Sequence, residues 1–245
     1  MPEHGLTPGG SATVRSVSDG DTIRLEDGRR LRLVGIQAPE RPVLGRNGDI
    51  WPLADEAKSY LEDIVLDKRL QLFYGKQKRD RHRRILAHAV LGDGVWVQGA
   101  LLKAGLAHVY TFPDNRALAA ELYVIEDEAR EAGLGIWADA YYQVLQAEDI
   151  DGTGAQYAGR FRIVEGVIQG ANNVRGRVYL NFGERWSKDF TVIIERRVAR
   201  QFQAEWINNP QQLRGQRVQL RGWMHDENGP MIRLSHPEQL RFLRE

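Results

Sequence analysis

The chain has 245 residues, of which 42% are hydrophobic and 27% charged, a balance typical of a folded globular protein and not of a disordered one. This length suffices for two domains of ordinary size. No apolar run approaches the roughly 20 residues that a membrane-spanning helix needs, and the absence of cysteine excludes disulfides and thiolate metal sites.

The first 11 residues are polar and lack the apolar core of a signal peptide. We therefore expect a cytoplasmic protein, or a secreted or periplasmic one if a leader has been removed from the N-terminus. We expect no membrane partner.

The net charge of +1 hides an asymmetry between the two halves of the chain. Residues 1–157 hold 19 Lys and Arg against 24 Asp and Glu, a balance of −5, whereas residues 158–245 hold 15 against 9, a balance of +6. The basic half suits contact with a polyanion, but ordinary surface charge explains it equally well.

Residues 17–40 read as a two-stranded hairpin whose turn is Asp27-Gly28. Asp19 and Asp21 precede the first strand, Arg32 lies in the second, and Glu40 follows it. Carboxylates spaced i, i+2 can point to one side of an extended chain, and the hairpin returns Arg32 beside them. Acids and a guanidinium brought together in this way suit the binding of a phosphate with a hard metal ion.

The rest of the first half predicts a compact α+β unit that is mainly β. In chain order we expect a polar loop at 41–52, a helix at 53–66, strands at 69–74 and 85–91, a short helix at 97–104 closed by Gly105, and a longer helix from an Asn115 N-cap to about 132. Strands of this number and order with covering helices are typical of a five-stranded OB-type β-barrel.

The second half restarts the strand pattern after a stretch without periodicity. We predict a linker at 141–158, then strands at 161–168, 177–182 and 189–194, a helix at 196–208, and a hairpin of 217–223 with 230–235. This order is again OB-like and resembles, by pattern alone, nucleic-acid-binding OB modules attached to tRNA-handling and polymerase proteins. The predicted domains are thus 12–140 and 159–245.

Four motifs in the first half occur in the order and spacing of one known family. They are Asp19-Gly20-Asp21-Thr22 followed by Arg32 to Glu40, Asp80 to Arg84, Gly105-Leu-Ala107, and Gly135-Ile-Trp137. Together they resemble the staphylococcal nuclease (thermonuclease) family over roughly residues 12 to 140. The resemblance implies an OB-fold barrel and a Ca²⁺-dependent phosphodiesterase that hydrolyses DNA or RNA, with products ending in 3′-phosphate.

The resemblance also implies roles for individual residues. Asp21 would be a direct metal ligand and Ala38 would lend its backbone carbonyl, with Asp19 as electrostatic support. Glu40 would orient or deprotonate the attacking water. Arg32 and Arg84 would bind the phosphate, since a planar guanidinium matches two of its oxygens.

Two positions depart from the family pattern. Gln37 stands where the family has an aspartate metal ligand; its amide oxygen can coordinate but carries no charge, so we expect a weakened Ca²⁺ site, active mainly at raised metal concentration, or an inactive one. Arg83 replaces a glycine and His82 its aromatic neighbour, so we expect a reshaped loop before Arg84.

Several further features admit two interpretations. The loop 76–84 carries six cations and could follow a phosphate backbone, or be a solvated hairpin tip. We favour a core position for Tyr110 and Phe112. In the second domain, aromatic residues interleaved with arginines could stack bases, although alternation favours core positions for half of the rings; they are Tyr179, Phe182, Trp186 and Trp223 with Arg175, Arg177, Arg185 and Arg221.

Three functions therefore remain open. The first is a nuclease acting on nucleic acid, most naturally single-stranded, with a second domain that adds affinity. The second is a nucleic-acid-binding protein that kept the barrel and has weak or no catalysis. The third is a scaffold whose second domain binds protein.

Overall fold

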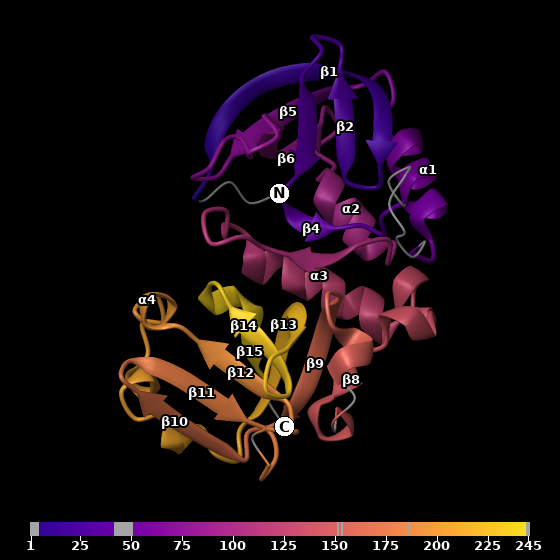
Figure 1. Ribbon diagram of the computed structural model, residues 1–245. Helices are drawn as coiled ribbons and strands as arrows, with labels where there is room; N and C mark the ends of the chain where they lie inside the picture. Colours follow the sequence, from indigo (N-terminus) through magenta and orange to yellow (C-terminus); the bar gives the residue numbers. More distant parts are fainter. Residues whose placement is uncertain (1–4, 42–50, 151, 153, 186, 244–245) are drawn as a thin grey trace. The chain divides into compact units, whose positions relative to one another are not determined.

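The computed structural model describes residues 5–41, 51–150, 152, 154–185 and 187–243 (Figure 1). The chain forms two compact units, Met1–Tyr142 and Gln143–Glu245. Among the described residues, no helix is long and apolar enough to cross a membrane. The predicted polar loop at 41–52 lies largely outside the described residues.

The first unit is built on a closed barrel with the strand order β1-β2-β3-β6-β5. The strands are β1 (Thr7–Asp19), β2 (Thr22–Leu25), β3 (Arg30–Leu33), β5 (Arg69–Tyr74) and β6 (Ile85–Leu91). Neighbours are antiparallel except β3 and β6, which are parallel. The prediction of a mainly β fold with a five-stranded barrel is confirmed.

The opening hairpin forms because its turn and its apolar positions favour the same strand register. Gly28 has a φ of 83°, which a residue with a side chain adopts at a cost. Thr22 then lies opposite Arg32, and Ile23 opposite Leu31. Ile23 and Leu31 are completely buried, so the pleat that sends them into the core also sets the side to which Arg32 points.

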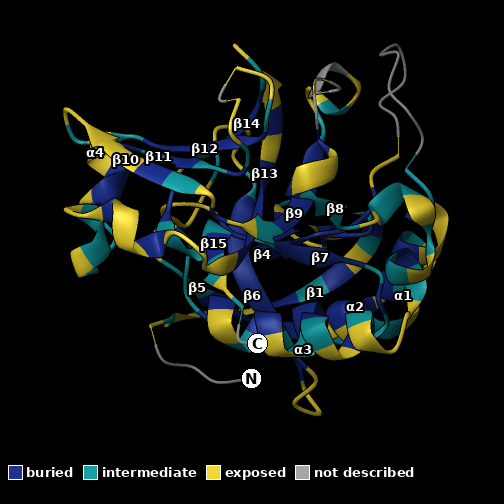
Figure 2. Cartoon of the chain, turned by 90° about the horizontal axis from the view of Figure 1, so that it is seen from below, coloured by how far each residue is buried: buried dark blue, intermediate teal, exposed yellow. Residues whose placement is uncertain are grey.

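Three helices cover this barrel: α1 (Ala54–Val65), α2 (Val97–Lys103) and α3 (Ala119–Glu131). Each has buried positions on one side and exposed positions on another (Figure 2). The predicted N-cap at Asn115 is wrong: α3 is preceded by Leu118 in a left-handed conformation, and the Asn115 amide instead donates to the Gln77 carbonyl at 2.9 Å.

Two short strands that the sequence did not predict, β4 (Gly35–Gln37) and β7 (His108–Tyr110), pair antiparallel outside the barrel. Glu126 on α3 is buried and accepts the Val109 backbone N–H at 2.5 Å. The carboxylate therefore joins α3 to β7, and through β7 to β4.

The second unit contains a larger sheet, in the order β10-β11-β12-β14-β13-β9-β8, with β15 paired to β13. Its strands are β8 (Leu145–Gln146), β9 (Phe161–Val167), β10 (Gly170–Val174), β11 (Arg177–Asn181), β12 (Thr191–Ile194), β13 (Arg217–Asp226), β14 (Pro230–Leu234) and β15 (Leu240–Phe242). β8 comes from the segment predicted as a linker and pairs with β9.

The order of this sheet can be compared with that of the first barrel. If β9 and β10 are taken as two arms of one bent strand, the order is the same as β1-β2-β3-β6-β5, again with one parallel pair, β12 and β14. The hydrogen-bonded path is nevertheless open between β9 and β10. The second unit is thus a half-barrel, in which the strands follow the predicted OB-like order without closing into a barrel.

The predicted helix at 196–208 is wrong in length. α4 covers only Arg196–Ala199, and the 3₁₀ turns η5 (Glu205–Ile207) and η6 (Pro210–Leu213) follow. The helix ends at Arg200, whose backbone N–H still donates to the Arg196 carbonyl at 3.4 Å. Phe202 and Trp206 nevertheless contact each other, with ring centroids 5.2 Å apart.

Gly105 should be intolerant of substitution. Its φ is 66°, and a Cβ built there would lie 2.2 Å from the Leu134 carbonyl oxygen. We expect Gly105→Ala to lower the free energy of unfolding by about 3 kcal/mol or more, measured by urea denaturation. Gly28→Ala is the matched control, because Gly28 also has positive φ but nothing lies within 4 Å of its built Cβ; it should cost about 1–2 kcal/mol. Equal losses would contradict the proposed clash.

His88 should make stability depend on pH. Its ring lies in the core, and burial lowers its pKa from 6.5 to about 4, although a hydrogen bond with the Ala117 backbone works in the opposite direction. Below pH 6.5 the His88 side chain is therefore protonated in the unfolded chain, whereas in the folded chain it stays neutral down to about pH 4. Stability is fully present above pH 6.5 and falls as the pH drops towards 4, by up to about 3 kcal/mol.

The test is urea denaturation of the parent and of His88→Gln at several pH values between 4 and 7. The variant should lose less stability with acid than the parent. His82→Gln, which removes an exposed histidine of the same unit, should follow the parent. Parallel curves for all three proteins would contradict the assignment to His88.

Candidate active site

Five of the six predicted catalytic and metal-binding residues come together at one end of the first barrel. They are Asp21 in the β1–β2 turn, Arg32 on β3, Gln37 at the end of β4, and Ala38 and Glu40 just beyond it. Arg32 Nη2 lies 3.1 Å from Asp21 Oδ2, and both side chains are more than 90% buried. A buried ion pair of this kind holds both partners in one orientation.

Close packing of the β1–β2 turn positions Asp21. A Cβ added to Gly20 would lie 2.7 Å from the Ala38 Cβ, so the turn can approach β4 only with glycine at this position. Asp21 Oδ2 then accepts the Ala38 backbone N–H at 3.1 Å, and Oδ1 accepts the Thr22 hydroxyl at 3.0 Å. Each carboxylate oxygen of Asp21 thus already has a donor from the protein.

Gln37 lies at the centre of the cluster. Its Oε1 accepts a hydrogen bond from Arg32 Nη2 at 2.9 Å. Its Nε2 donates to Glu40 Oε1 at 2.8 Å, to the Ala38 carbonyl at 2.9 Å and to Asp21 Oδ2 at 3.3 Å. The orientation of the amide is determined, because a guanidinium has only donors and the remaining neighbours are acceptors.

Asp19 lies beside this cluster with an altered acidity. Desolvation by burial, together with the negative charges of Asp21 and Glu40, raises the pKa of Asp19 to about 6, and Arg32 only partly opposes this. Its Oδ1 accepts the Gly20 backbone N–H at 3.0 Å. This hydrogen bond and the charge of Arg32 both act to lower the pKa of Asp19, but burial and the neighbouring carboxylates outweigh them.

Arg84, the sixth predicted residue, bonds elsewhere. Its Nε donates to Asp80 Oδ2 at 2.7 Å, and its backbone N–H to Asp80 Oδ1 at 2.9 Å. Partial burial acts to raise the pKa of Asp80, but the bonds from Arg84 outweigh it and hold that pKa below its usual value. Arg84 immediately precedes β6, whose Ile85 pairs with Leu31 beside Arg32, so its backbone lies at the same end of neighbouring strands.

With this geometry established, comparison with known proteins identifies the first unit. The family described as "Staphylococcal nuclease homologue" matches residues 30–139. A thermonuclease of Staphylococcus intermedius is 32% identical over 132 residues, which are 53% of this chain and 77% of that protein. The chain belongs to the staphylococcal nuclease family.

Other relatives match the same part of the chain. Endonuclease YncB of Bacillus subtilis is 32% identical over 139 residues, 54% of this chain and 64% of that protein. An uncharacterized endonuclease of Escherichia coli is 35% identical over 128 residues, 51% of this chain and 74% of that protein. Each of these matches thus covers about half of this chain.

The loop before Arg84 keeps a backbone conformation that favours glycine. Arg83, which stands where the staphylococcal nuclease family has glycine, has a φ of 62°. The side chain makes this conformation cost about 1–2 kcal/mol. Asp80 compensates, since its Oδ1 accepts backbone N–H groups from both His82 and Arg84. Sequence reasoning missed this role of Asp80, although an acid four residues before an arginine was a signal for it.

The ring pair near the site is partly exposed. Tyr110 and Phe112 contact edge to face with centroids 4.9 Å apart, and Phe112 is 41% exposed. The core position favoured for Phe112 is therefore wrong.

The Ca²⁺ that the family implies does not fit the residues as they are placed. The oxygens of Asp21, Ala38 and Glu40 that a hard cation would collect converge on Gln37 Nε2, which is an N–H donor. Turning the amide to offer its oxygen would point Nε2 at Arg32, which cannot accept a hydrogen bond. The described residues also contain no group of three or more His, Cys, Asp or Glu suited to a metal ion.

Gln37→Asp should make the stability of the first unit depend on bound Ca²⁺. Without metal, the added carboxylate faces Asp21 and Glu40, so we expect the free energy of unfolding to fall by about 1–3 kcal/mol. Ca²⁺ should restore it in the variant and change it much less in the parent. Urea denaturation in chelator and over a Ca²⁺ series measures this. Gln71→Asp, an exposed glutamine of β5, is the control and should show no Ca²⁺ response. Micromolar Ca²⁺ binding by the parent in calorimetry would contradict the argument.

Proposed function

We propose that this protein is a nuclease that hydrolyses phosphodiester bonds in DNA or RNA. The observation that carries the proposal is the cluster of Asp21, Arg32 and Glu40 at the end of a staphylococcal nuclease barrel. The names of its relatives, a thermonuclease and endonucleases, support the same reaction class.

Each residue has a part in this proposal that follows from its position. Arg32 is buried and presents a guanidinium of fixed orientation, which suits stabilisation of charge on the non-bridging oxygens of the phosphate. Glu40 is exposed and can take the proton of the attacking water as that oxygen bonds to phosphorus. Arg84, partly exposed and held by Asp80, would bind the phosphate from a second side. The bond between phosphorus and the 5′ oxygen then breaks, this oxygen takes up a proton from solvent, and the product ends in 3′-phosphate.

The proposal includes dependence of the hydrolysis on Ca²⁺. A cation can reach the oxygens of Asp21 and Glu40 only if Gln37 Nε2 releases them. We therefore expect Ca²⁺ to act only at raised concentration, as the missing charge at position 37 also implies.

A second function, nucleic-acid binding with little catalysis, is favoured by one specific observation. Gln37 donates to Glu40 and accepts from Arg32, so the proposed base and the proposed phosphate-binding group are both already bonded within the site. A protein with these bonds intact in solution would bind nucleic acid without hydrolysing it efficiently.

Removing Glu40 or Arg84 separates the two functions. If the protein is a nuclease, Glu40→Ala and Arg84→Ala should each lower kcat by about 100-fold or more, because each removes a group that acts in the transition state. Arg24→Ala, at an exposed position of β2, is the control and should leave kcat unchanged.

The assay uses single-stranded DNA and RNA over a Ca²⁺ series, with identification of the phosphate end of the product. Cleavage that is unaffected by Glu40→Ala would refute the mechanism. Binding without cleavage at any Ca²⁺ concentration would favour the second function.

A further inference from the structure

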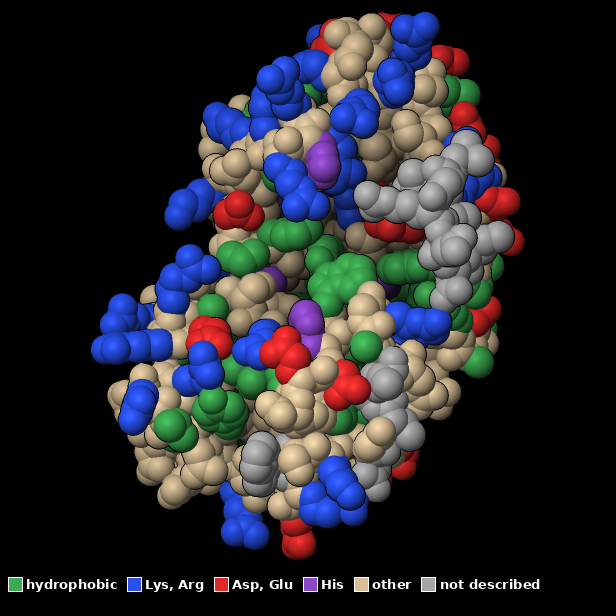
Figure 3. Space-filling view, in the orientation of Figure 1, with side chains coloured by type: hydrophobic (Ala, Val, Ile, Leu, Met, Phe, Trp, Pro, Cys, Tyr) green, Lys and Arg blue, Asp and Glu red, His purple; other side chains and the backbone are tan. Residues whose placement is uncertain are grey.

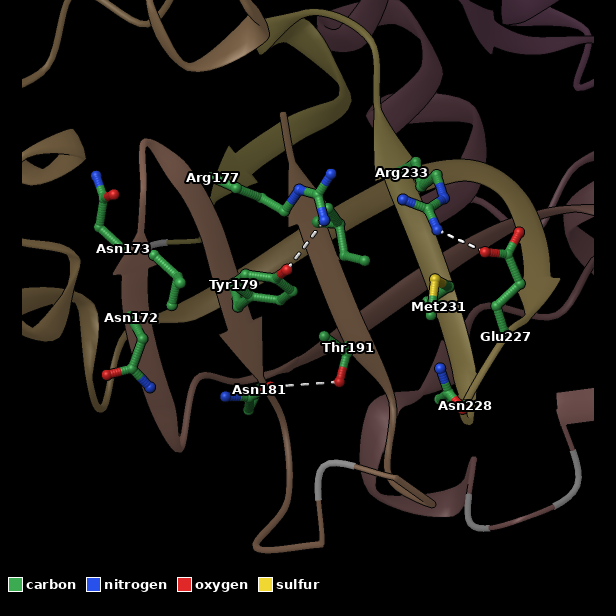
Figure 4. Close-up of a pocket in the computed structure, with 12 residues that line it drawn as sticks. Asn172, Asn173, Arg177, Tyr179, Asn181, Thr191, Glu227, Asn228, Met231 and Arg233 are labelled. Carbon is green, nitrogen blue, oxygen red and sulfur yellow. Dashed lines mark hydrogen bonds and ion pairs between the residues drawn. The ribbon is translucent and has the colours of Figure 1, made fainter. Parts of the chain in front are cut away.

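A groove of about 550 Å³ lies on one face of the half-barrel (Figure 4). It is lined by residues from β10, β11, β12, β14 and the β13–β14 turn: Asn172, Asn173, Val174, Arg177, Tyr179, Asn181, Thr191, Ile193, Glu227, Asn228, Met231 and Arg233. All of these belong to the second unit, and none was assigned a role in the nuclease site.

The register of the strands explains why these side chains share one face. Tyr179 on β11 lies opposite Asn172 on β10 and Ile193 on β12, and Ile193 lies opposite Arg233 on β14. On β11, β12 and β14 their immediate neighbours point the other way, into the core, where Val178, Val192 and Leu234 are buried. Residues two positions apart then extend the groove along the strands.

The floor of the groove is apolar and its walls are polar. Ile193 and Met231 are less than 8% exposed, although they lie on the outer face of the sheet. The Tyr179 ring stands on one side, where its hydroxyl accepts a hydrogen bond from Arg177 Nη1 at 3.2 Å (Figure 4). On the other side, Asn228 lies in the β13–β14 turn.

The two arginines of the groove are paired with glutamates, of which Glu227 lines the groove and Glu195 lies beside it. Arg177 Nε lies 2.9 Å from Glu195, Arg233 Nη1 lies 3.4 Å from the same carboxylate, and Arg233 Nη2 lies 2.7 Å from Glu227. Two arginines and two glutamates thus form one chain of ion pairs. A groove whose arginines are paired in this way, with an aromatic ring and amide groups, suits a flat neutral group that forms hydrogen bonds at its edges and stacks on its face.

Positive charge lies at the end of the groove where β11 begins. Arg175 precedes β11 in the β10–β11 turn, and Arg196 and Arg197 open α4; all three are exposed. A Cβ built on Gly176 would lie 2.9 Å from Arg196 Cγ, so α4 and the turn are in contact. Figure 3 shows exposed Lys and Arg side chains at several places on the second unit, whose residues 158–245 carry a net charge of +6 (15 − 9).

We propose that this groove binds single-stranded nucleic acid, with one unpaired base against Tyr179 and the adjoining phosphates at Arg175, Arg196 and Arg197. The proposal deepens the nuclease function and rests on it for the identity of the polymer. The second and third strands of an OB-type sheet, with the turns beside them, are a face that such folds use for oligonucleotides. Duplex is excluded from the groove because its bases are already stacked and paired.

Tyr179, Phe182, Trp186 and Trp223 do not contribute equally to this site. Phe182 is buried in the core, Trp223 is 44% exposed on β13 outside the groove, and Trp186 lies outside the described residues. Among the described residues, Tyr179 is the aromatic one that lines the groove.

The test measures fluorescence anisotropy of a labelled 12-nucleotide single strand on the full chain in chelator, so that binding is separated from cleavage. Tyr179→Leu, which keeps an apolar cover over Ile193 but removes the ring, should weaken binding by about 5- to 20-fold, and Tyr179→Phe by less than about twofold. Trp223→Leu is the matched aromatic control and should leave the affinity unchanged.

The arginines are tested by the salt dependence of the same binding. Arg196→Gln with Arg197→Gln should weaken binding and reduce the slope of log K against log salt by about 0.7 for each phosphate that the variant no longer neutralises. Arg217→Gln, an exposed arginine at the other end of β13, should leave the slope unchanged. A duplex competitor should displace the strand poorly.

Photocrosslinking of a bromouridine-substituted strand to the unmutated protein provides a readout that does not depend on folding of the variants. Crosslinks in the peptides that contain Tyr179 or Met231 support the proposal. Crosslinks confined to residues 1–142, equal affinity of Tyr179→Leu and the parent, or absence of binding would each overturn it. If Glu40→Ala leaves cleavage intact while Tyr179→Leu loses binding, the nuclease mechanism fails and the groove stands.

Discussion

The donor–acceptor arrangement around Gln37 is the constraint on which the chemistry of the first unit depends. Arg32 can only donate and the carboxylates of Asp21 and Glu40 are placed to accept, so an amide between them has one satisfactory orientation. In that orientation an N–H group lies where oxygens would otherwise gather around a cation. The site is thus satisfied internally, and any ligand must compete with bonds that the protein already makes.

The two units achieve similar strand orders with different degrees of closure. In the first, β1 is long enough to pair with both β2 and β5, and the barrel closes. In the second, β9 pairs with β13 and β10 pairs with β11, so two separate strands do what β1 does alone. The chain between β9 and β10 interrupts the hydrogen-bonded path. The two units also carry their candidate sites in different places. The groove of the second unit lies on the face of β10, β11, β12 and β14, whereas the acids and Arg32 of the first unit lie at the end of its barrel.

Strands with a clear period-2 pattern and the motif spacing were predictable from the sequence, but β1, whose first residues were interpreted as a polar tail, was not. β5 and β6 match their predicted bounds to the residue, because period-2 patterns bounded by turn residues have few alternatives. β4, β7 and β10 were not predicted, since strands of three to five residues with glycine or asparagine carry no clear period. Motif spacing predicted which residues meet at the site, but not the orientation of the Gln37 amide, which depends on all its neighbours at once. The groove of the second unit depends on the register of four strands and was likewise beyond a reading of the sequence.

The link from β4 through β7 to Glu126 has a consequence for the order in which the protein matures. Gln37 pairs with His108, and the neighbouring Val109 is bonded to Glu126, 89 positions after Gln37 in the chain. The barrel strands β1 to β3 can pair locally as soon as they are synthesised, but the strand that carries Gln37 has no partner until β7 and α3 follow. The position of Gln37 beside Asp21 and Arg32 therefore depends on residues that follow it by 71 to 89 positions, whereas the pairing of β2 with β3 needs no later part of the chain.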